Sequence, residues 1–210
     1  MAADAILACQ QCPRLAAFLN DIRGRYPDYH ARPVPAFGAG QPRLLIVGLA
    51  PGLHGANATG RPFTGDYAGI LLYQTLYDFG FSNTPVSERA DDGLELMDCR
   101  ITNAVKCLPP QNKPNGAEIA TCNTYLTQEL ACLAELKVIL ALGRVAHGAV
   151  LKALRLKQAD WPFAHHRIHT LPSGLALVDS YHSSRYNIQT KRLTSEAFTD
   201  VFVSIRRLLS

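Results

Sequence analysis

Residues 43–69 read RLLIVGLAPGLHGANATGRPFTGDYAG. The run Leu44–Leu49 is apolar and too short for a helix, which is typical of a buried strand. Six of the chain's 15 glycines lie within residues 48–69, and glycine permits tight turns and close approach of the backbone to a ligand. This stretch therefore predicts a buried strand that leads directly into a ligand-binding loop.

Three other short apolar runs predict further buried strands, at Ile101–Val105, Val138–Leu142 and Ala176–Ser180. Patterns of helical spacing surround them, at Pro13–Arg23, Ile70–Phe79, Ala117–Leu136, Arg144–Leu154 and Ser195–Leu209. Asn115 and Glu118 form a pair resembling a capping box before the third of these helices. The alternation predicts an α/β fold, a single three-layer αβα domain over residues 1–210 with a central, mostly parallel four-stranded sheet. Because ligands bind beyond the carboxyl ends of such strands, the loops after them are the candidate site.

Composition limits the class of protein. A chain of 210 residues with 48% hydrophobic and 18% charged residues suits one globular domain. No apolar run is long enough to span a bilayer, and the start of the chain lacks the pattern of a signal peptide. We therefore expect a cytoplasmic monomer that does not bind membranes.

The net charge of +4 is unevenly distributed along the chain. Residues 1–136 carry 10 Lys and Arg against 13 Asp and Glu, whereas residues 137–210 carry 11 against four, together with five of the seven histidines. A cationic half indicates an anionic partner such as nucleic acid. The alternative is an ordinary solvated surface with a skewed charge count.

The six cysteines are Cys9, Cys12, Cys99, Cys107, Cys122 and Cys132. Disulfides are not expected without a secretory signal. Cys9 and Cys12 form a C-x-x-C pair, and with Cys107 and Cys122 they supply four thiolates, enough for a [4Fe–4S] cluster or a tetrahedral zinc ion. Zinc sites more often use two C-x-x-C pairs, so the wide spacing of the second pair favours iron–sulfur. A redox pair is a further alternative, and Cys99 and Cys132 are expected to be small buried hydrophobic residues.

Several motifs together resemble one known family. They are the early C-x-x-C, the glycine-rich stretch 48–69, TNAVKC at 102–107, Cys122, and SYHSSRYNIQTKRLT at 180–194. In this order they resemble the iron–sulfur uracil-DNA glycosylases over nearly the whole chain, and within them the B-type, or fifth-family, branch. The A-type branch typically has a glutamate where this chain has Ala50. One departure is Ser183, where the family usually has a proline, and we expect this change to loosen the loop.

The resemblance implies a monofunctional DNA repair enzyme that hydrolyses the bond between a deaminated base and its sugar. Uracil is the expected base, with hypoxanthine and other deaminated bases also accepted, in double-stranded DNA. The base has to leave the stack before it can be cleaved. The resemblance also implies a structural [4Fe–4S] cluster at the cysteines Cys9, Cys12, Cys107 and Cys122.

Four residues are candidates for the base pocket. Phe63 matches the aromatic residue that lies under the uracil ring in the family, although a phenylalanine is commonly just buried. The Asn103 amide has a donor and an acceptor that suit the edge of uracil, but it could also be a turn residue at a strand end. Asp66 is the only carboxylate of the glycine-rich stretch and is a candidate catalytic group or a simple helix N-cap. His182 is the second catalytic candidate, as a hydrogen-bond donor to the departing base, or a structural histidine.

Two other groups complete the predicted site. Backbone and side chains of the first loop are expected to touch the substrate, namely Gly48, Leu49, Ala50, His54 and Asn57. The last motif is expected to grip DNA phosphates through Ser184, Arg185, Asn187, Lys191 and Arg192. Arg185 or Tyr186 is the candidate to fill the space left by the extruded base.

Two other functions fit parts of the sequence. One is a non-catalytic nucleic-acid-binding protein with an iron–sulfur cluster, which the altered His182-Ser183 motif would favour. The other is an α/β phosphohydrolase or nucleotide-binding domain. The glycine-rich loop is followed by neither a Walker lysine nor paired metal-binding carboxylates, which disfavours that second reading.

Overall fold

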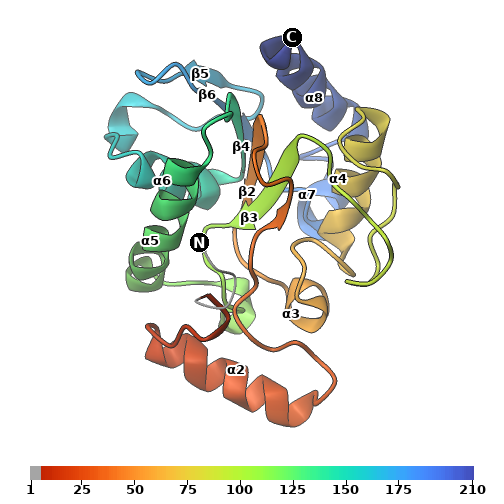
Figure 1. Cartoon of the computed structure of the whole chain (residues 1–210), viewed down its shortest axis with the longest axis vertical. Helices are drawn as coiled ribbons and strands as arrows, with labels where there is room; N and C mark the ends of the chain where they lie inside the picture. The colour runs from red at the N-terminus through yellow and green to blue at the C-terminus, as the bar shows by residue number, and fades with distance from the viewer. Residues whose placement is uncertain (1–5) are drawn as a thin grey trace.

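The computed structural model describes residues 6–210 and is built around one sheet (Figure 1). Its strands are β1 (Phe37–Gly38), β2 (Leu44–Gly48), β3 (Cys99–Asn103), β4 (Val138–Leu142), β5 (Ile168–Thr170) and β6 (Ala176–Ser180). They lie in the order β1-β3-β2-β4-β6-β5. The four central strands are parallel, and the two edge strands are antiparallel to their neighbours.

The α/β class is confirmed, but the prediction of four strands is wrong because the sheet has six. The two additional strands are edge strands of two and three residues, and β5 is mostly exposed. Strands of two or three residues contain no apolar run that a sequence reading can detect. The second predicted strand also lies two residues too late, since Val105 is buried against helix α2 (Pro13–Arg25) instead of within the sheet.

Helices cover both faces of the sheet. They are α3 (Ala56–Thr59), α4 (Tyr67–Asp78), α5 (Gly116–Cys132), α6 (Arg144–Ala153), α7 (Arg185–Gln189) and α8 (Ser195–Leu209), with short 3₁₀ turns η1 (Pro110–Asn112) and η2 (Gln158–Asp160). Alternate residues of a strand point to opposite faces. Accordingly, Leu44 and Ile46 pack in the core under α4 and α8, while Leu45 and Val47 pack in the core under α5 and α6 (Figure 1).

Helix α5 begins with the predicted capping box. The Asn115 side chain accepts a hydrogen bond from the Glu118 backbone N–H, and the Glu118 carboxylate accepts one from the Asn115 N–H. The helix ends at Cys132, four residues earlier than expected. Cys132 is exposed there, so its prediction as a buried residue is wrong, whereas Cys99 is fully buried in β3.

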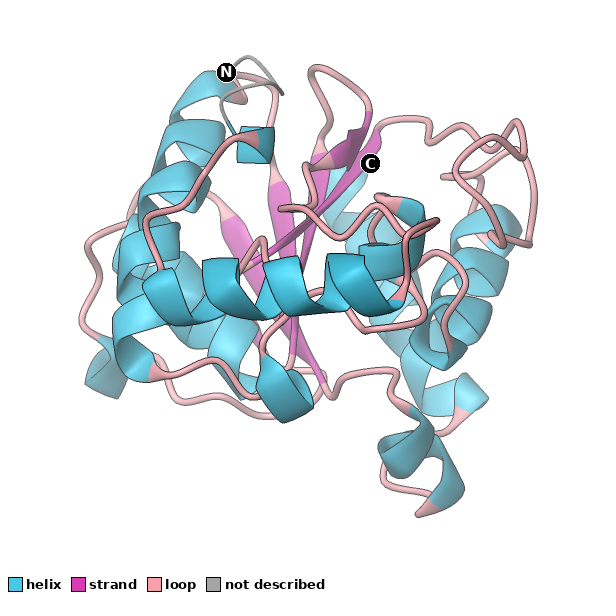
Figure 2. Cartoon of the chain, turned by 90° about the horizontal axis from the view of Figure 1, so that it is seen from below, coloured by secondary structure: helices cyan, strands magenta, loops and turns pink. Residues whose placement is uncertain are grey.

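Helix α2 lies across the carboxyl end of the sheet, in front of the strands when seen from below (Figure 2). Its buried face, with Leu15, Leu19 and Ile22, packs against the segment that follows β3, including Val105 and Leu108. Helix α2 is therefore held against the segment that follows β3. Within residues 6–210, no helix combines the length and the apolar character needed to cross a membrane.

Candidate active site

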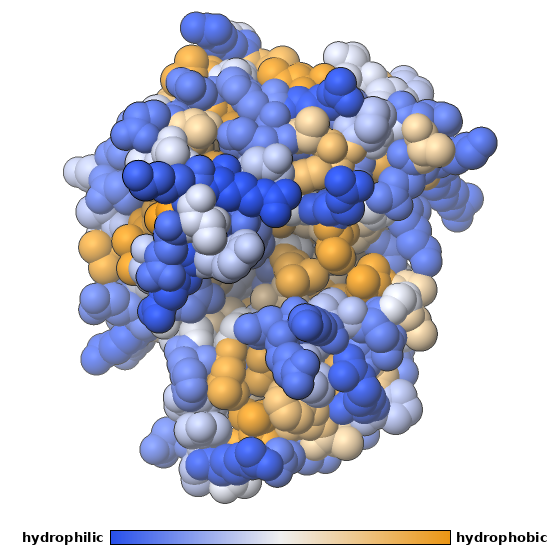
Figure 3. Space-filling model, turned by 180° about the vertical axis from the view of Figure 1, so that it is seen from behind, coloured by the Kyte–Doolittle hydropathy of each residue, from blue (hydrophilic) through white to orange (hydrophobic). Residues whose placement is uncertain are grey.

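A cavity of about 490 Å³ lies where the central parallel strands end. Its walls come from the loop after β2, the last residue of β3, the start of α6 and the loop after β6. Phe63, Asp66, Asn103 and His182 all line it. Seen from behind, the molecule is hollowed near its middle, and hydrophobic side chains gather in that hollow (Figure 3). The four residues singled out for the base pocket therefore lie together, although more than 110 positions separate Phe63 from His182.

Gly48, at the end of β2, is where two of these side chains meet. A Cβ atom at this position would collide with Oδ1 of Asn103 and would lie 2.7 Å from the Phe63 ring. Only glycine therefore lets the backbone approach both groups. Phe63 itself has a φ of 57°, a left-handed conformation that is costly for a bulky residue and is found mainly where the surroundings enforce it.

The Asn103 side chain is buried without a full set of hydrogen bonds. Asn103 is 3% exposed, and its Oδ1 atom has no hydrogen-bond partner among the described residues. A buried polar atom without a partner costs about 1–3 kcal/mol, so most such atoms in proteins are satisfied. An unpartnered amide at the wall of a cavity is suited to a ligand that supplies the missing partner.

Phe63 and His182 form the aromatic part of the cavity. Their rings are stacked, with centroids 5.7 Å apart and planes inclined by 27°. Burial lowers the pKa of His182 to about 4, because a low-polarity environment disfavours the charged imidazolium. At neutral pH the ring is therefore uncharged and offers one N–H donor.

Asp66 has two roles in the structure, because it begins helix α4 and also lines the cavity. Its Oδ1 atom accepts a hydrogen bond of 3.1 Å from the Gly69 N–H. Burial raises the pKa of Asp66, partly offset by the backbone hydrogen bonds from Gly69 and Ala68. A Cβ at Gly55 would collide with the Asp66 side chain, so the glycine-rich loop makes room for the carboxylate. The N-cap interpretation is correct, and it leaves the carboxylate at the cavity wall.

A buried arginine fixes the loop between Phe63 and the sheet. Arg61 is 4% exposed and donates hydrogen bonds to Asp92 at 2.6 Å, to Ser87 at 2.8 Å and to Thr64 at 2.8 Å. Burial alone would raise the pKa of Asp92. The hydrogen bonds from Arg61 and from backbone N–H groups outweigh this effect and lower that pKa to about 2. The aromatic floor of the cavity is therefore attached to a rigid, ion-paired loop.

The first loop supplies only some of its predicted substrate contacts. Leu49 and Ala50 line the cavity, whereas His54 and Asn57 do not. His54 is exposed and bonds through Nδ1 to the Tyr29 hydroxyl at 2.8 Å. Asn57 is fully buried, and its amide nitrogen donates to the Leu53 carbonyl at 3.4 Å. Both residues hold the loop in shape without touching the cavity.

Ser183 anchors the loop after β6. It is fully buried, and its hydroxyl donates a hydrogen bond of 2.8 Å to the Ala68 carbonyl in the first turn of α4. The expected loosening at this position is therefore countered by a bond that a proline could not make. It joins the loop that carries His182 to the helix that begins at Asp66.

The DNA-gripping candidates lie at and beyond the rim of the cavity. Ser184 lines it and caps α7 by accepting from the Asn187 N–H, while the Asn187 amide donates to the His182 carbonyl at 2.8 Å. Arg185 is exposed at the rim, with its guanidinium 5.0 Å from the centre of the Tyr67 ring. The remaining candidates lie outside the cavity lining, namely Tyr186, Lys191 and Arg192, and Tyr186 is 69% exposed.

The sequence reading missed part of the wall. Tyr67 and Ala68 contribute from α4, Asn112 from η1, and Arg144 and Val145 from the start of α6. The sequence predicts a helix that begins at Arg144, directly after a strand, but nothing in its pattern assigns a site residue there. Its position after β4 is the signal that could have identified Arg144, because loops that leave neighbouring parallel strands meet at one edge.

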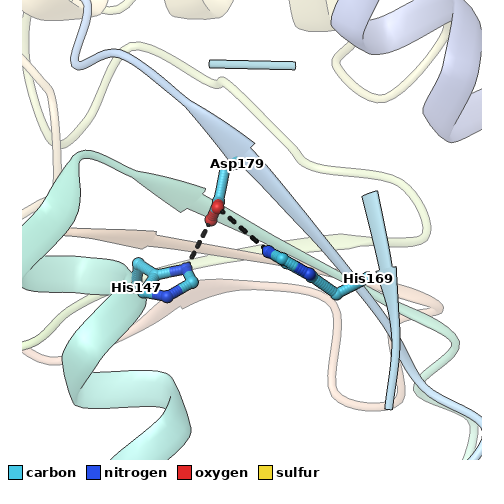
Figure 4. Close-up of side chains that lie close together, drawn as sticks. All are labelled: His147, His169 and Asp179. Atoms are coloured by element: carbon cyan, nitrogen blue, oxygen red, sulfur yellow. Dashed lines mark hydrogen bonds and ion pairs between the residues drawn. The ribbon is translucent and has the colours of Figure 1, made fainter. Parts of the chain in front are cut away.

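A buried polar group joins α6, β5 and β6 (Figure 4). His147 on α6 bonds to Asp179 on β6 at 2.7 Å and to the Trp161 carbonyl at 2.8 Å, and the His169 ring lies 3.5 Å from the same carboxylate. A carbonyl and a carboxylate both accept hydrogen bonds, so both ring nitrogens of His147 face acceptors. The group ties α6, which begins at Arg144, to β6, which ends two residues before His182.

The four cysteines expected to bind a metal surround one small region beside α2. Cys9, Cys12, Cys107 and Cys122 all line it, and the Lys106 backbone N–H donates to the Cys122 sulfur at 3.2 Å. Burial, followed by the neighbouring cysteines, raises the pKa of Cys107 to about 12. Burial also raises the pKa values of Cys12 and Cys122. A bound metal would be needed to hold these three groups as thiolates.

The spacing of the sulfurs distinguishes two kinds of metal site. Around one zinc ion, with Zn–S distances of about 2.3 Å, the sulfurs lie roughly 3.8 Å apart. In residues 6–210, the only group of three or more potential ligand atoms within 4.8 Å of one another is His147, His169 and Asp179. No three of the cysteine sulfurs in this part of the chain are that close, so their spacing does not match a single zinc ion.

Comparison with known proteins gives consistent results. Residues 35–206 match the family model described as "Uracil DNA glycosylase superfamily". A "Type-5 uracil-DNA glycosylase" of Thermus thermophilus is 45% identical over 97% of this chain and 94% of its own length. Proteins of the same name from Mycobacterium leprae and Mycobacterium bovis are 42% and 40% identical over 97% of this chain, and over 92% and 79% of their own lengths.

Proposed function

Because the chain belongs to the uracil DNA glycosylase superfamily, we propose that it removes uracil from DNA by hydrolysing the bond between base and sugar. The family expected from the motifs is thereby confirmed, and the activity is inferred from relatives that share the name of uracil-DNA glycosylase. We further propose that residues 1–210 act as one catalytic domain on double-stranded DNA.

The single observation that carries this proposal is the unpartnered Asn103 amide at the wall of an apolar cavity. A uracil extruded from the helix enters this cavity and lies against the face of Phe63. The Asn103 amide then pairs with the polar edge of the base and gains the partner that it lacks. Stacking on an aromatic ring contributes about 1–3 kcal/mol per base, and the hydrogen bonds discriminate between bases.

Asp66 and His182 divide the catalytic work. The bond between the sugar C1′ and the base nitrogen breaks, and its electron pair leaves with the base, so the sugar becomes cationic and the base anionic. The Asp66 carboxylate stabilises the cationic sugar and orients a water molecule, whose oxygen bonds to C1′. The neutral His182 donates a hydrogen bond to the anionic base, which finally takes up the proton released by the water. Fixed charges and dipoles of this kind usually provide the largest share of catalysis.

The size of the cavity supports a wider range of bases. A volume of about 490 Å³ lies within the range of about 300–1,000 Å³ that is typical of small-molecule sites. Such a cavity has room for a bicyclic base such as hypoxanthine as well as for uracil. We therefore propose that deaminated purines are also substrates.

The loop after β6 is proposed to hold the DNA strand at the extruded nucleotide. Ser184 and Arg185 lie at the rim of the cavity, where phosphate oxygens of the strand would pass. Tyr186 is exposed at the same loop, and either it or Arg185 fills the gap in the duplex. Asn187 contributes indirectly by holding the His182 carbonyl, and Lys191 adds positive charge further out.

We propose that Cys9, Cys12, Cys107 and Cys122 hold a [4Fe–4S] cluster. The donor set fits, because four thiols line one region and no three sulfurs are close enough for a single zinc ion. When bound, such a cluster crosslinks α2 to α5 and to the segment after β3. That segment begins directly after Asn103, so the crosslink would also fix the position of the base-reading amide.

A gel assay on a duplex with one uracil, followed by alkaline cleavage of the abasic product, tests the proposal. The wild-type protein is expected to yield abasic product. Asp66→Asn is expected to lower the single-turnover rate about 10²–10³-fold with the affinity for DNA retained, since asparagine also caps a helix well. Tight binding without any abasic product from the wild-type protein would instead support a non-catalytic DNA-binding protein.

A further inference from the structure

Three cations on α6 and just after its end form an exposed strip that has no role in the proposed function. We define the basic strip as Arg144, Lys152 and Arg155, all of which are exposed. Together they line one open groove of about 500 Å³, whose floor includes Ile119, Ala149 and Leu156. Among residues 6–210, no Asp or Glu lines this groove.

The strip is continuous with the base cavity. Arg144 and Val145 line both hollows, so the groove begins where the cavity ends. Its position differs from that of the gripping loop after β6, because α6 packs beside α5, whereas Arg185 in α7 contacts Tyr67 of α4 (Figure 1). The cavity therefore has cations on two separate sides.

The charges of the strip are available to a partner. Elsewhere in the chain, buried or half-buried arginines are paired with carboxylates, as in Arg61 with Asp92 and Arg100 with Glu129. Among the described residues, none of the three cations of the strip forms a salt bridge. They also belong to the cationic part of the chain, residues 137–210, whose excess of positive charge pointed to an anionic partner.

The length of the strip suits a DNA strand. From Arg144 to Lys152 the helix rises roughly 12 Å at 1.5 Å per residue. One strand of a duplex carries a phosphate about every 3.4 Å along its axis, so this distance corresponds to about three or four phosphates. An open groove with cations at its edges and no carboxylate in its walls matches the phosphate backbone of a strand in charge and in extent.

We propose that the basic strip binds the phosphates of the DNA strand as it continues from the extruded nucleotide, on the side of the cavity opposite the gripping loop. This inference rests on the proposed function, because it assigns a path to the same substrate. It also adds to the predicted DNA contacts, all of which lie in the loop after β6.

The test uses the full-length chain carrying Lys152→Glu and Arg155→Glu, beside a control with the same change in charge, Lys137→Glu with Arg207→Glu. Lys137 directly precedes β4 and so lies at the amino end of the parallel strands, away from the cavity. Arg207 lies in the last turn of α8. Affinity for a uracil-containing duplex is measured by fluorescence anisotropy over a range of salt concentrations.

We expect the strip variant to bind about tenfold more weakly at low salt and to reduce the slope of log K against log salt by about 1.8, or 0.9 for each lost phosphate contact. The control is expected to match the wild-type protein in both. Shortening the duplex on one side of the uracil should abolish the difference between the strip variant and the wild type, and shortening the other side should preserve it.

An unchanged slope, an equal loss in the control, or an identical response to shortening either side would each overturn the inference. Uracil excision by the wild-type protein, measured on the same duplex, separates this failure from that of the proposed function. If the wild-type protein excises uracil and the slope is unchanged, only the basic strip is wrong. If it produces no abasic product, the proposed function itself fails.

Discussion

The base cavity and the cysteine region lie at the same end of the sheet, but they are built in opposite ways. At the cavity wall, Oδ1 of the buried Asn103 has no hydrogen-bond partner within residues 6–210, and the neighbouring Gly48 has no Cβ atom that would collide with it. In the cysteine region four thiols are packed among the apolar residues of α2, such as Leu15. The first arrangement suits a ligand that enters and leaves, and the second suits one that stays.

The two regions are nevertheless coupled through a short segment of chain. Asn103 ends β3, and Cys107 lies only four residues later. Between them, Lys106 is buried, with its ammonium group bonded to Thr102 and 3.5 Å from Glu129, while its backbone N–H donates to Cys122. Loss of the bound cluster should therefore disturb the position of Asn103 and weaken binding of the base.

The largest effect is expected from Cys107→Ser. Because a bound cluster contributes its binding energy to folding, we expect iron content and the yield of folded protein to fall about tenfold or more, with activity lost as a consequence. Iron analysis and circular dichroism of the purified protein measure this. The matched control is Cys132→Ser, which changes an exposed cysteine and should leave both unchanged. Full iron content in the Cys107 variant would contradict the assignment.

A change in the cavity should act on catalysis and leave the cluster intact. Phe63→Leu keeps an apolar side chain but removes the flat face, so we expect excision to slow by about 10- to 100-fold, the equivalent of the stacking energy. Iron content should be unaffected. Phe81→Leu is the control, since Phe81 is fully buried in the core under α8 and should affect stability alone. Equal rates for the two variants would argue against a base on Phe63.

Ser183→Ala should have a smaller effect, which lowers both the excision rate and the stability of the protein. The lost hydrogen bond to Ala68 is worth about 1 kcal/mol, so we expect a rate about fivefold lower and a melting temperature lower by about 2–4 °C. Ser183→Pro should recover part of the rate, because the ring restrains the loop in another way. Kinetics and thermal melting of the three proteins provide the comparison, and a Ser183→Ala protein as fast as the wild type would remove the anchor from the account.

The smallest effect concerns two carboxylates whose pKa values are shifted in opposite directions. Burial raises the pKa of Asp66 in the folded protein. The protonated side chain is therefore favoured in the folded state, and ionisation as pH rises through that pKa destabilises the protein. Asp66→Asn should therefore raise the melting temperature at pH 8. The folded pKa of Asp92 is about 2, so its contribution is present above the unfolded value and is lost as pH falls. Asp92→Asn should lower the melting temperature at the same pH, and shifts of equal sign would contradict this assignment.

The sequence predicted the parts of the fold that depend on buried, periodic segments. The runs 138–142 and 176–180 form strands with the expected bounds, and residues 195–209 form the expected helix. The prediction failed for the edge strands β1 and β5, which are too short to show a pattern. It also failed at Val105, whose burial comes from α2. Local patterns cannot reveal such contacts because they depend on residues distant in the chain.

The candidate site shows the same division. Phe63, Asp66 and Asn103 belong to motifs with chemical meaning, from which they were predicted as site residues, and all three line the cavity. Arg144 was missed because it is an ordinary arginine at the start of a helix, and only the fold brings it to the cavity. His54 was assigned from its position in the motif, but its hydrogen bond to Tyr29 keeps it at the surface.

The most direct test of the central claim is a crystal structure of the Asp66→Asn protein bound to a duplex with one uracil. The account predicts a uracil outside the helix, with its ring on Phe63 and its polar edge on the Asn103 amide. A uracil still stacked within the duplex, or one bound elsewhere with the Asn103 amide unpartnered, would contradict it.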